Sequence, residues 1–208
     1  MSVFRILFFT AILLPSALFA QNDTLATATG DLDKDNVPEK VIVLNTGETT
    51  DWGKVREIQI LKQEAGKWKV WKSSVNAIRK SEQGGMMGDP FAGIEIVKGI
   101  LLVQHEGGSS WKWNYTDKYR YQNDQFELIG HTTFYGKLCE SFSELDYNLS
   151  TGSAIATVET FTCEDFEEVD STKETEEFKY TGIKLNLQNR TLSEHEILTP
   201  KNQWAFSL

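Results

Sequence analysis

The stretch IEIVKGILLVQHEGGSSWKWNYTDKYRYQNDQFELIG, residues 94–130, decides the fold class. Its apolar and aromatic residues fall into runs of strand length, and three turn signals separate these runs: Lys98-Gly99, Gly107-Gly108 and Asn123-Asp124. Such a pattern predicts four strands in an antiparallel meander. Residues 56–75, REIQILKQEAGKWKVWKSSV, are typical of a further hairpin. We therefore expect an all-β, antiparallel chain with little helix, arranged as a sandwich or as propeller-like sheets.

The N-terminus has the build of a secretory signal peptide. Residues 1–20, MSVFRILFFTAILLPSALFA, place the basic residue Arg5 before an apolar run and end in the small residue Ala20. The alternative is an uncleaved membrane anchor, for which the apolar run is short. We expect an exported protein in the periplasm, at the cell surface or in the medium, with one all-β domain over residues 21–208 and no membrane insertion after cleavage.

Charge and cysteine content narrow the partners and the compartment. The 208-residue chain has a formal net charge of −9, so nucleic acid is not an expected partner. Two cysteines in an exported chain predict a disulfide. Cys139 and Cys163 lie at equal distances from Thr151, within the turn signal 150–152. One hairpin folded about Thr151 would set the two cysteines opposite each other, which predicts a Cys139–Cys163 bridge.

An acidic stretch, GDLDKDNVPEKVIV at residues 30–43, predicts a calcium loop in a hairpin over about residues 27–45. Calcium takes six to eight oxygen ligands, which a tight loop can supply from its positions 1, 3, 5, 7 and 9. The ligands would be Asp31, Asp33, Asp35, the Val37 carbonyl and Glu39. Position 12 is Ile42, inside an apolar strand, which excludes an EF-hand. The alternative is a solvated acidic turn without metal.

The same loop resembles the calcium-bearing β-hairpin loop of FG-GAP (integrin-propeller type) repeats, D-x-D-x-D-G-x-x-D followed by an apolar strand. The resemblance implies the ligand set just named and a structural calcium ion. Asn36 stands in place of Gly, and Glu39 in place of the last Asp, which implies a lower affinity. Because the chain contains one copy of the loop, the resemblance does not imply a full propeller.

A wider resemblance covers about residues 27–165. The segment that begins GGMMGDPFAGIEI, at Gly84, resembles a segment of uncharacterised exported proteins of Bacteroidetes-like bacteria. The shared features are a G-D-P-F turn, a G-I-E-I strand, an H-x-G-G-S turn, a W-x-W-x-Y strand and a Y-R-Y-Q-N hairpin, preceded by an acidic calcium-type loop. The resemblance implies no activity.

Five aromatic residues of one predicted strand all stand at odd-numbered positions: Trp111, Trp113, Tyr115, Tyr119 and Tyr121. Because successive side chains of a strand point to opposite faces, these five would share one face. Such a strip could stack on sugar rings. A two-residue Asn123-Asp124 turn would instead set Tyr121 opposite Phe126 and Tyr119 opposite Leu128, which favours a core face. Half-open Trp111 and Trp113 side chains would distinguish a sugar platform from the core.

Polar residues crowd the turn HEGGSS, residues 105–110, and suggest a hydrolase site as an alternative function. His105 could serve a nearby serine as a base, with Glu106 and Asp89 close by. The G-x-S-x-G elbow of hydrolases is not present. His131 and His195 stand alone, without metal-type partner spacing.

The C-terminal third gives weaker signals. Residues 164–177, EDFEEVDSTKETEE, predict a solvated excursion between strands, with a second cation site as the alternative. Residues 178–192, FKYTGIKLNLQNRTL, are typical of a closing strand pair. Taken together, the sequence favours an exported calcium-binding module without enzymatic activity. This module either binds a partner or is associated with the cell envelope. Its partner would be a glycan or a protein, bound by an open sheet face or by the Gly-rich loops 84–89 and 107–110.

Overall fold

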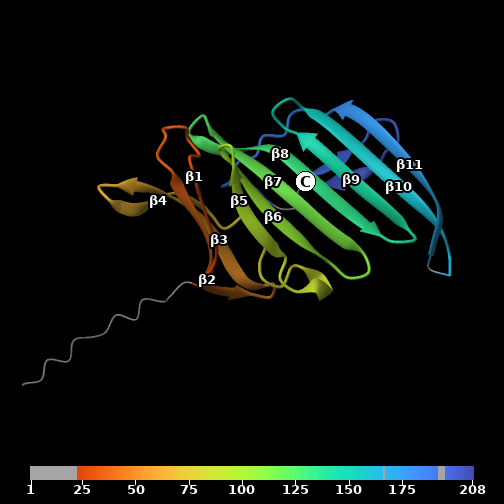
Figure 1. The fold of residues 1–208 in the computed structure, drawn as a ribbon, viewed down its shortest axis with the longest axis horizontal. Helices are drawn as coiled ribbons and strands as arrows, with labels where there is room; N and C mark the ends of the chain where they lie inside the picture. Colours follow the sequence, from red (N-terminus) through yellow and green to blue (C-terminus); the bar gives the residue numbers. More distant parts are fainter. Residues whose placement is uncertain (1–22, 166, 192–194) are drawn as a thin grey trace, which may run out of the picture.

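The computed structural model describes residues 23–165, 167–191 and 195–208 (Figure 1). The predicted signal peptide, residues 1–20, lies outside the described residues. In the part of the chain that is described, no helix has the length and apolar character needed to cross a membrane. The only helical turn there is a short 3-10 turn at Gly85–Met87, and every other element is a strand.

Four antiparallel strands near the N-terminus form the first sheet, with the spatial order β1-β2-β3-β4. They are β1 (Thr24–Gly30), β2 (Glu39–Thr50), β3 (Gly53–Glu64) and β4 (Lys67–Ser74). The hairpin predicted over 56–75 is confirmed as β3 and β4. Its two turn residues, Ala65 and Gly66, have positive φ of 50° and 77°, as a tight hairpin turn requires.

Seven strands form the second sheet, and their spatial order follows the chain. They are β5 (Phe91–Val97), β6 (Ile100–Gly108), β7 (Lys112–Gln122), β8 (Gln125–Lys137), β9 (Ser141–Asn148), β10 (Ser153–Glu164) and β11 (Glu167–Lys179). The predicted meander is confirmed as β5 to β8. Tyr121 lies opposite Phe126 and Tyr119 opposite Leu128, the register that the Asn123-Asp124 turn predicted.

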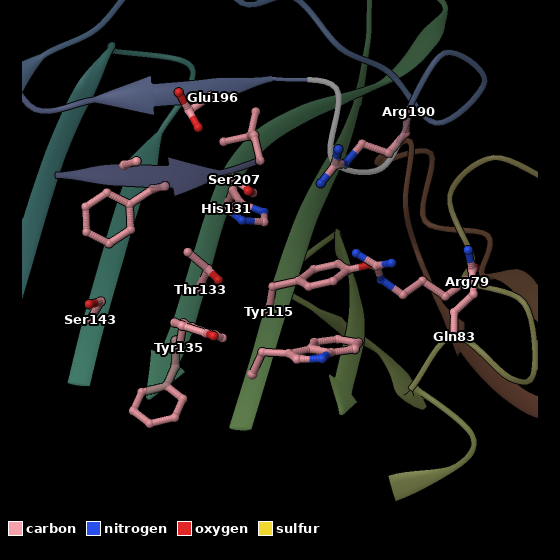
Figure 2. A pocket seen from close by; sticks show the side chains of 15 residues that line it. Arg79, Gln83, Tyr115, His131, Thr133, Tyr135, Ser143, Arg190, Glu196 and Ser207 are labelled. Carbon is pink, nitrogen blue, oxygen red and sulfur yellow. The ribbon is translucent and has the colours of Figure 1, made fainter. Parts of the chain in front are cut away.

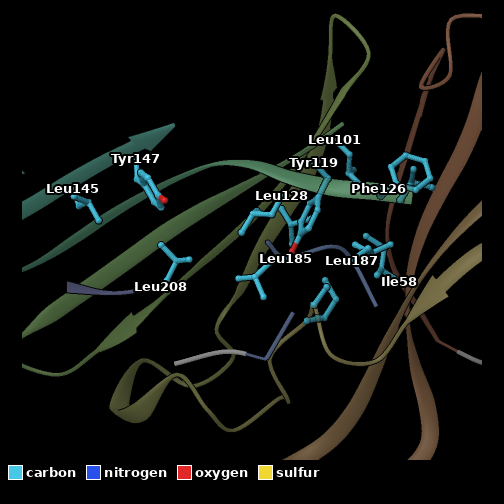
Figure 3. Close-up of a cluster of buried hydrophobic side chains, with 14 of the residues drawn as sticks. Ile58, Leu101, Tyr119, Phe126, Leu128, Leu145, Tyr147, Leu185, Leu187 and Leu208 are labelled. Carbon is cyan, nitrogen blue, oxygen red and sulfur yellow. The ribbon is translucent and has the colours of Figure 1, made fainter. Parts of the chain in front are cut away.

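The two sheets form a sandwich-like arrangement, one of the two arrangements predicted, and a two-stranded ribbon of β12 (Glu196–Leu198) and β13 (Ala205–Ser207) packs with them. A single cluster of buried side chains joins all three (Figure 3). Ile58 comes from the first sheet, Leu101 and Phe126 from the second, and Leu208 follows the ribbon. Burying each such side chain contributes about 1.5–3 kcal/mol, so this core is the main source of stability.

The prediction for the acidic segment 164–177 was wrong, because residues 167–179 form the edge strand β11, paired with β10. An edge strand has one neighbour, so its acidic side chains can stay in water while its backbone is paired. Among the described acidic side chains of β11, Glu176 is the buried one, and it accepts the amides of Lys201 and Asn202 at 2.7 and 3.0 Å. Charge density alone did not reveal this strand.

The predicted strand pair over 178–192 was also wrong. Of the described residues 178–191, only the first two belong to a strand, the end of β11. The segment after them crosses the core and touches β8 through backbone hydrogen bonds of 2.9 Å at Leu185 and Leu187. Both leucines are buried, which explains the alternating apolar pattern that suggested a strand.

The two sheets meet where β1 lies beside β5 (Figure 1). Gly30 ends β1, and a Cβ atom there would stand 2.7 Å from a methyl carbon of Ile96. Gly99, in the β5–β6 turn, has a φ of +77°, and a Cβ atom there would stand 3.1 Å from the carbonyl oxygen of Asp31. Both close approaches require glycine. We call this contact region the seam; the acidic loop begins beside it.

Candidate metal centre

The acidic loop connects β1 to β2 and is held by its own side chains. Asp31 accepts the backbone amides of Lys34 and Asn36 at 2.7 and 3.1 Å. Asp33 accepts the amide of Asp35 at 3.2 Å. Lys34 and Asn36 have φ of 68° and 66°, the left-handed conformation that Asn tolerates better than most residues. These bonds fold the loop tightly enough for alternate side chains to turn toward one centre.

Three of the five predicted ligands come together. Asp31, Asp33 and Glu39 each offer a carboxylate oxygen, and these oxygens lie within 4.8 Å of one another. Glu39 is the first residue of β2, and its side chain is 1% exposed, with Oε2 accepting the Leu32 amide at 2.7 Å. Among the described residues, this is the only group of three or more His, Cys, Asp or Glu side chains placed to hold a metal ion.

The other two predicted ligands lie further out. The Asp35 side chain is half exposed and does not join the group of converging oxygens; its Oδ1 accepts the Val37 amide at 2.7 Å. Val37 lies on the same loop with an exposed side chain. Coordination by its carbonyl oxygen stays a prediction.

Sequence reasoning missed a fourth member of the cluster, Lys62 on β3. Its ammonium contacts Asp33, lies 3.8 Å from Asp35 Oδ2 and 3.7 Å from Glu39 Oε1, and stands 4.1 Å above the centre of the Trp71 ring. It is thus the cation that faces the loop carboxylates. Only the register of β3 on β2 brings Lys62 there, and the sequence did not give that register.

Burial and charge act differently on the individual carboxyl groups. Burial raises the pKa of Glu39 above its ordinary value, and the neighbouring charges of Asp33 and Asp35 add to the effect. At Asp33, burial is outweighed by the Lys62 ammonium and the Asp35 amide, which hold the pKa below its ordinary value. A further cation beside Glu39 would offset the repulsion from Asp33 and Asp35.

The oxygen-only donor set fits a hard divalent cation. Carboxylate and carbonyl oxygens suit calcium, magnesium or manganese, whereas nitrogen and sulfur ligands suit zinc or copper. With four acidic side chains against Lys62, the cluster keeps an excess of negative charge that a divalent ion would offset. The loop can therefore hold such an ion, with Asp31, Asp33 and Glu39 as its converging ligands.

The predicted disulfide is confirmed. Cys139 and Cys163 are bonded, with their Cα atoms 5.5 Å apart. The hairpin register differs by one residue from the prediction, because Asn148 pairs with Ser153. Cys139 lies before β9, in the turn that follows β8, so the bridge ties that turn to β10 rather than joining two directly opposed strand residues.

The structure does not assemble a hydrolase site at His105. The His105 ring is 1% exposed, stacks on the Tyr115 ring and meets the Phe91 ring edge-on, and its Nε2 accepts the Arg79 amide at 3.2 Å. Burial lowers the pKa of His105 to about 3. Asp89 instead accepts both ends of the buried Arg56 guanidinium.

The remaining hydrolase candidates lie elsewhere. Glu106, Ser109 and Ser110 are exposed, and none of them hydrogen-bonds to His105 in the described structure. The turn is therefore a surface turn above a buried histidine.

The aromatic strip divides into a core part and a pocket part. Tyr115 and Tyr119 are buried, as the core interpretation predicted. Trp111 and Trp113 stay partly exposed. Trp111 stacks on Tyr135 with ring centres 5.1 Å apart, and Trp113 stacks on Tyr115 at 6.0 Å. Trp113 lines a pocket of about 470 Å³ between the inner face of β7 to β9 and the β12–β13 ribbon (Figure 2).

A buried polar network underlies that pocket, and sequence reasoning missed it. Asp117 and His131 lie directly opposite each other on β7 and β8, and His131 Nδ1 donates to Asp117 Oδ1 at 2.7 Å. Arg190 donates to Asp117 Oδ2 at 2.8 Å, and Tyr119 donates to the same oxygen at 3.2 Å. The Arg190 guanidinium and the hydrogen bond from His131 hold the pKa of Asp117 well below its ordinary value despite burial. Strand register could have paired Asp117 with His131, but nothing in the sequence placed Arg190 there.

Comparison of the chain with protein-family models, curated proteins and solved structures found no match.

Proposed function

We propose that this protein is an exported β-sandwich stabilised by one calcium ion on the loop 31–39, and that it acts as a non-enzymatic binding or envelope-associated module. The observation that carries the calcium part is the convergence of Asp31, Asp33 and Glu39 on a loop folded by its own carboxylates. Several buried or partly buried carboxylates this close repel one another, and a divalent cation offsets that repulsion.

Calcium suits this loop better than magnesium. Magnesium requires near-ideal octahedral geometry and keeps several waters, whereas calcium accepts six to eight oxygens in an irregular shell. Here the three converging carboxylates differ in their exposure to solvent. Glu39 is fully buried, whereas Asp31 and Asp33 are partly exposed. The half-exposed Asp35, the Val37 carbonyl and water can complete such an irregular shell.

The binding part of the proposal names a glycan or a protein as the partner. The partly exposed aromatic rings beside a pocket support it, because pockets for small ligands are lined by aromatic side chains with a few polar groups. The alternative of a hydrolase at His105 has no such support, since that ring is enclosed and its Nε2 already accepts an amide.

Thermal unfolding tests the calcium part. The thermal unfolding of a chain that begins at Gln21 is measured in excess EDTA, in millimolar calcium and in millimolar magnesium. A ligand that binds only the folded state stabilises it by about 2.7 kcal/mol at a hundredfold excess over Kd, so calcium should raise Tm clearly and magnesium little. Equal Tm values in EDTA and calcium would refute the proposal.

Two variants make this test specific. Asp33→Asn removes one charge from the cluster and should abolish most of the calcium-dependent rise in Tm. Asp51→Asn makes the same chemical change in the exposed β2–β3 turn and should leave the rise intact. An equal calcium response in both variants would mean that the ion binds elsewhere.

A further inference from the structure

We infer that the pocket under the β12–β13 ribbon binds a neutral saccharide of one or two rings. This inference deepens the binding part of the proposed function and is independent of the calcium loop. The pocket holds about 470 Å³, within the range of about 300–1,000 Å³ found for small-molecule sites. Its walls come from four separate parts of the chain: the inner face of β7 to β9, the segment around Arg79, Arg190, and the ribbon (Figure 2).

Aromatic faces form one side of the pocket. Trp113 lies directly opposite Tyr135 on neighbouring strands, and both rings line the pocket. Tyr135 is 49% exposed and is backed by the Trp111 ring, whose plane lies within 11° of its own. Trp113 stacks on Tyr115, and the planes of these two rings lie within 16° of each other. Rings held flat by a second ring offer a fixed apolar face, against which the C–H face of a sugar ring can pack.

The polar groups of the pocket can both donate and accept. Within the described structure, no hydrogen bond engages the hydroxyls of Tyr135, Ser143 and Ser207, the Glu196 carboxylate or the side-chain nitrogen of Gln83. A hydroxyl can donate one hydrogen bond and accept two, a carboxylate accepts, and an amide nitrogen donates. This mixture complements a ligand whose own groups are hydroxyls.

His131 adds a buried polar atom. Its ring lines the pocket and is 1% exposed, and Nε2 has no hydrogen-bond partner among the residues that the structure describes. Nδ1 is hydrogen-bonded to Asp117, so Nε2 is the ring nitrogen left to pair with a ligand. Buried polar atoms are nearly always paired, so an unpaired one beside a pocket indicates a missing partner. A ligand hydroxyl, which can donate or accept, would supply that partner.

Charge distinguishes a neutral ligand from an acidic one. The two guanidinium groups that line the pocket are both engaged. Arg190 is paired with Asp117, and Arg79 donates to the Tyr115 hydroxyl at 3.0 Å while lying 5.0 Å from the centre of the Trp113 ring. Glu196 adds a negative charge at the pocket. An anionic sugar would face this carboxylate, so a neutral one is the better fit.

Calorimetric titration tests the inference with defined probes, in EDTA and in calcium. The probes are glucose, galactose, mannose, N-acetylglucosamine, cellobiose, maltose and lactose, with glucuronate as the acidic comparison. We expect saturable binding of at least one neutral sugar in the millimolar range or below, and weaker binding of glucuronate. Tyr135→Ala, at an exposed position that should not impair folding, should weaken binding at least about tenfold, as removal of an aromatic anchor does. Trp113→Leu should do the same.

Trp68→Ala serves as the matched control, because Trp68 is an exposed aromatic residue of β4 and does not line the pocket. It should leave the affinity unchanged. Binding of none of the neutral sugars by the folded protein, preference for glucuronate, or equal affinity in wild type and Tyr135→Ala would each overturn the inference. We expect the sugar affinity to be the same in EDTA and in calcium. The saccharide inference and the calcium proposal are then tested independently, and the failure of one does not refute the other.

Discussion

At the scale of single residues, Lys62 and a calcium ion compete for the same carboxylates. Lys62 contacts Asp33 and lies within 4 Å of Asp35 and Glu39, closer than any other cation of the described residues. Exposed ion pairs contribute little, but this lysine is three-quarters buried and faces several acids at once. Calcium must therefore displace the Lys62 ammonium or push it toward the Trp71 ring.

Lys62→Gln should consequently have opposite effects with and without calcium. In EDTA the variant should have a lower Tm than wild type, because the acidic side chains lose their counter-charge. In calcium the deficit should shrink or reverse, because the competitor is gone. Lys69→Gln, which removes a lysine from the exposed pair with Glu64, should behave alike in both conditions. An equal Tm deficit for Lys62→Gln in both conditions would contradict the competition.

His105 should make the protein acid-sensitive. Its folded-state pKa is about 3, below the ordinary value of 6.5, because the ring is buried. Between these values the unfolded chain binds a proton that the folded chain does not, so stability is lost as the pH falls, by about 1.4 kcal/mol per unit. From pH 7 to pH 5, His105 should account for a loss of about 2 kcal/mol.

Urea unfolding at those two pH values checks this prediction. His105→Gln keeps an acceptor for the Arg79 amide but cannot titrate. The variant should lose about 2 kcal/mol less than wild type over the same interval, whatever its stability at pH 7. Identical losses in both proteins would show that His105 does not cause the acid sensitivity.

At the scale of elements, the disulfide ties the β8–β9 turn to β10. Its two cysteines are 24 residues apart, and closing a loop of that size stabilises the fold by about 2–4 kcal/mol. The Cys139→Ser, Cys163→Ser double variant should show that loss in urea unfolding, with its calcium-dependent rise in Tm unchanged because the bridge is remote from the loop 31–39. A stability equal to that of wild type would mean that the strands hold this turn in place without the disulfide.

Strands bounded by tight turns could be predicted from the sequence, whereas long-range contacts could not. The meander over 94–130 was predictable because residues such as Asn123 and Asp124 take positive φ and fix both turn and register. β11 was missed because acidic residues on an edge strand look like those of a loop. Loop spacing predicted Asp31, Asp33 and Glu39, but Lys62, Arg190 and the Asp117–His131 pair depend on packing between distant segments.

At the scale of the whole molecule, the acidic loop lies where the two sheets meet. The Asp31 carbonyl faces the β5–β6 turn at Gly99, and Gly30 packs on Ile96 of β5. An ion bound to this loop would therefore fix the end of β1 and, through the seam, the position of the first sheet on the second. Calcium would then stabilise the sandwich as a unit rather than one hairpin.

The central claim is that one calcium ion binds the loop 31–39, and calorimetric titration of the metal-stripped chain tests it most directly. The account predicts saturable binding of one calcium ion per chain in wild type and in Asp51→Asn, with binding lost or strongly weakened in Asp33→Asn. Binding that stays undetectable at millimolar calcium, or that persists unchanged in Asp33→Asn, would contradict it.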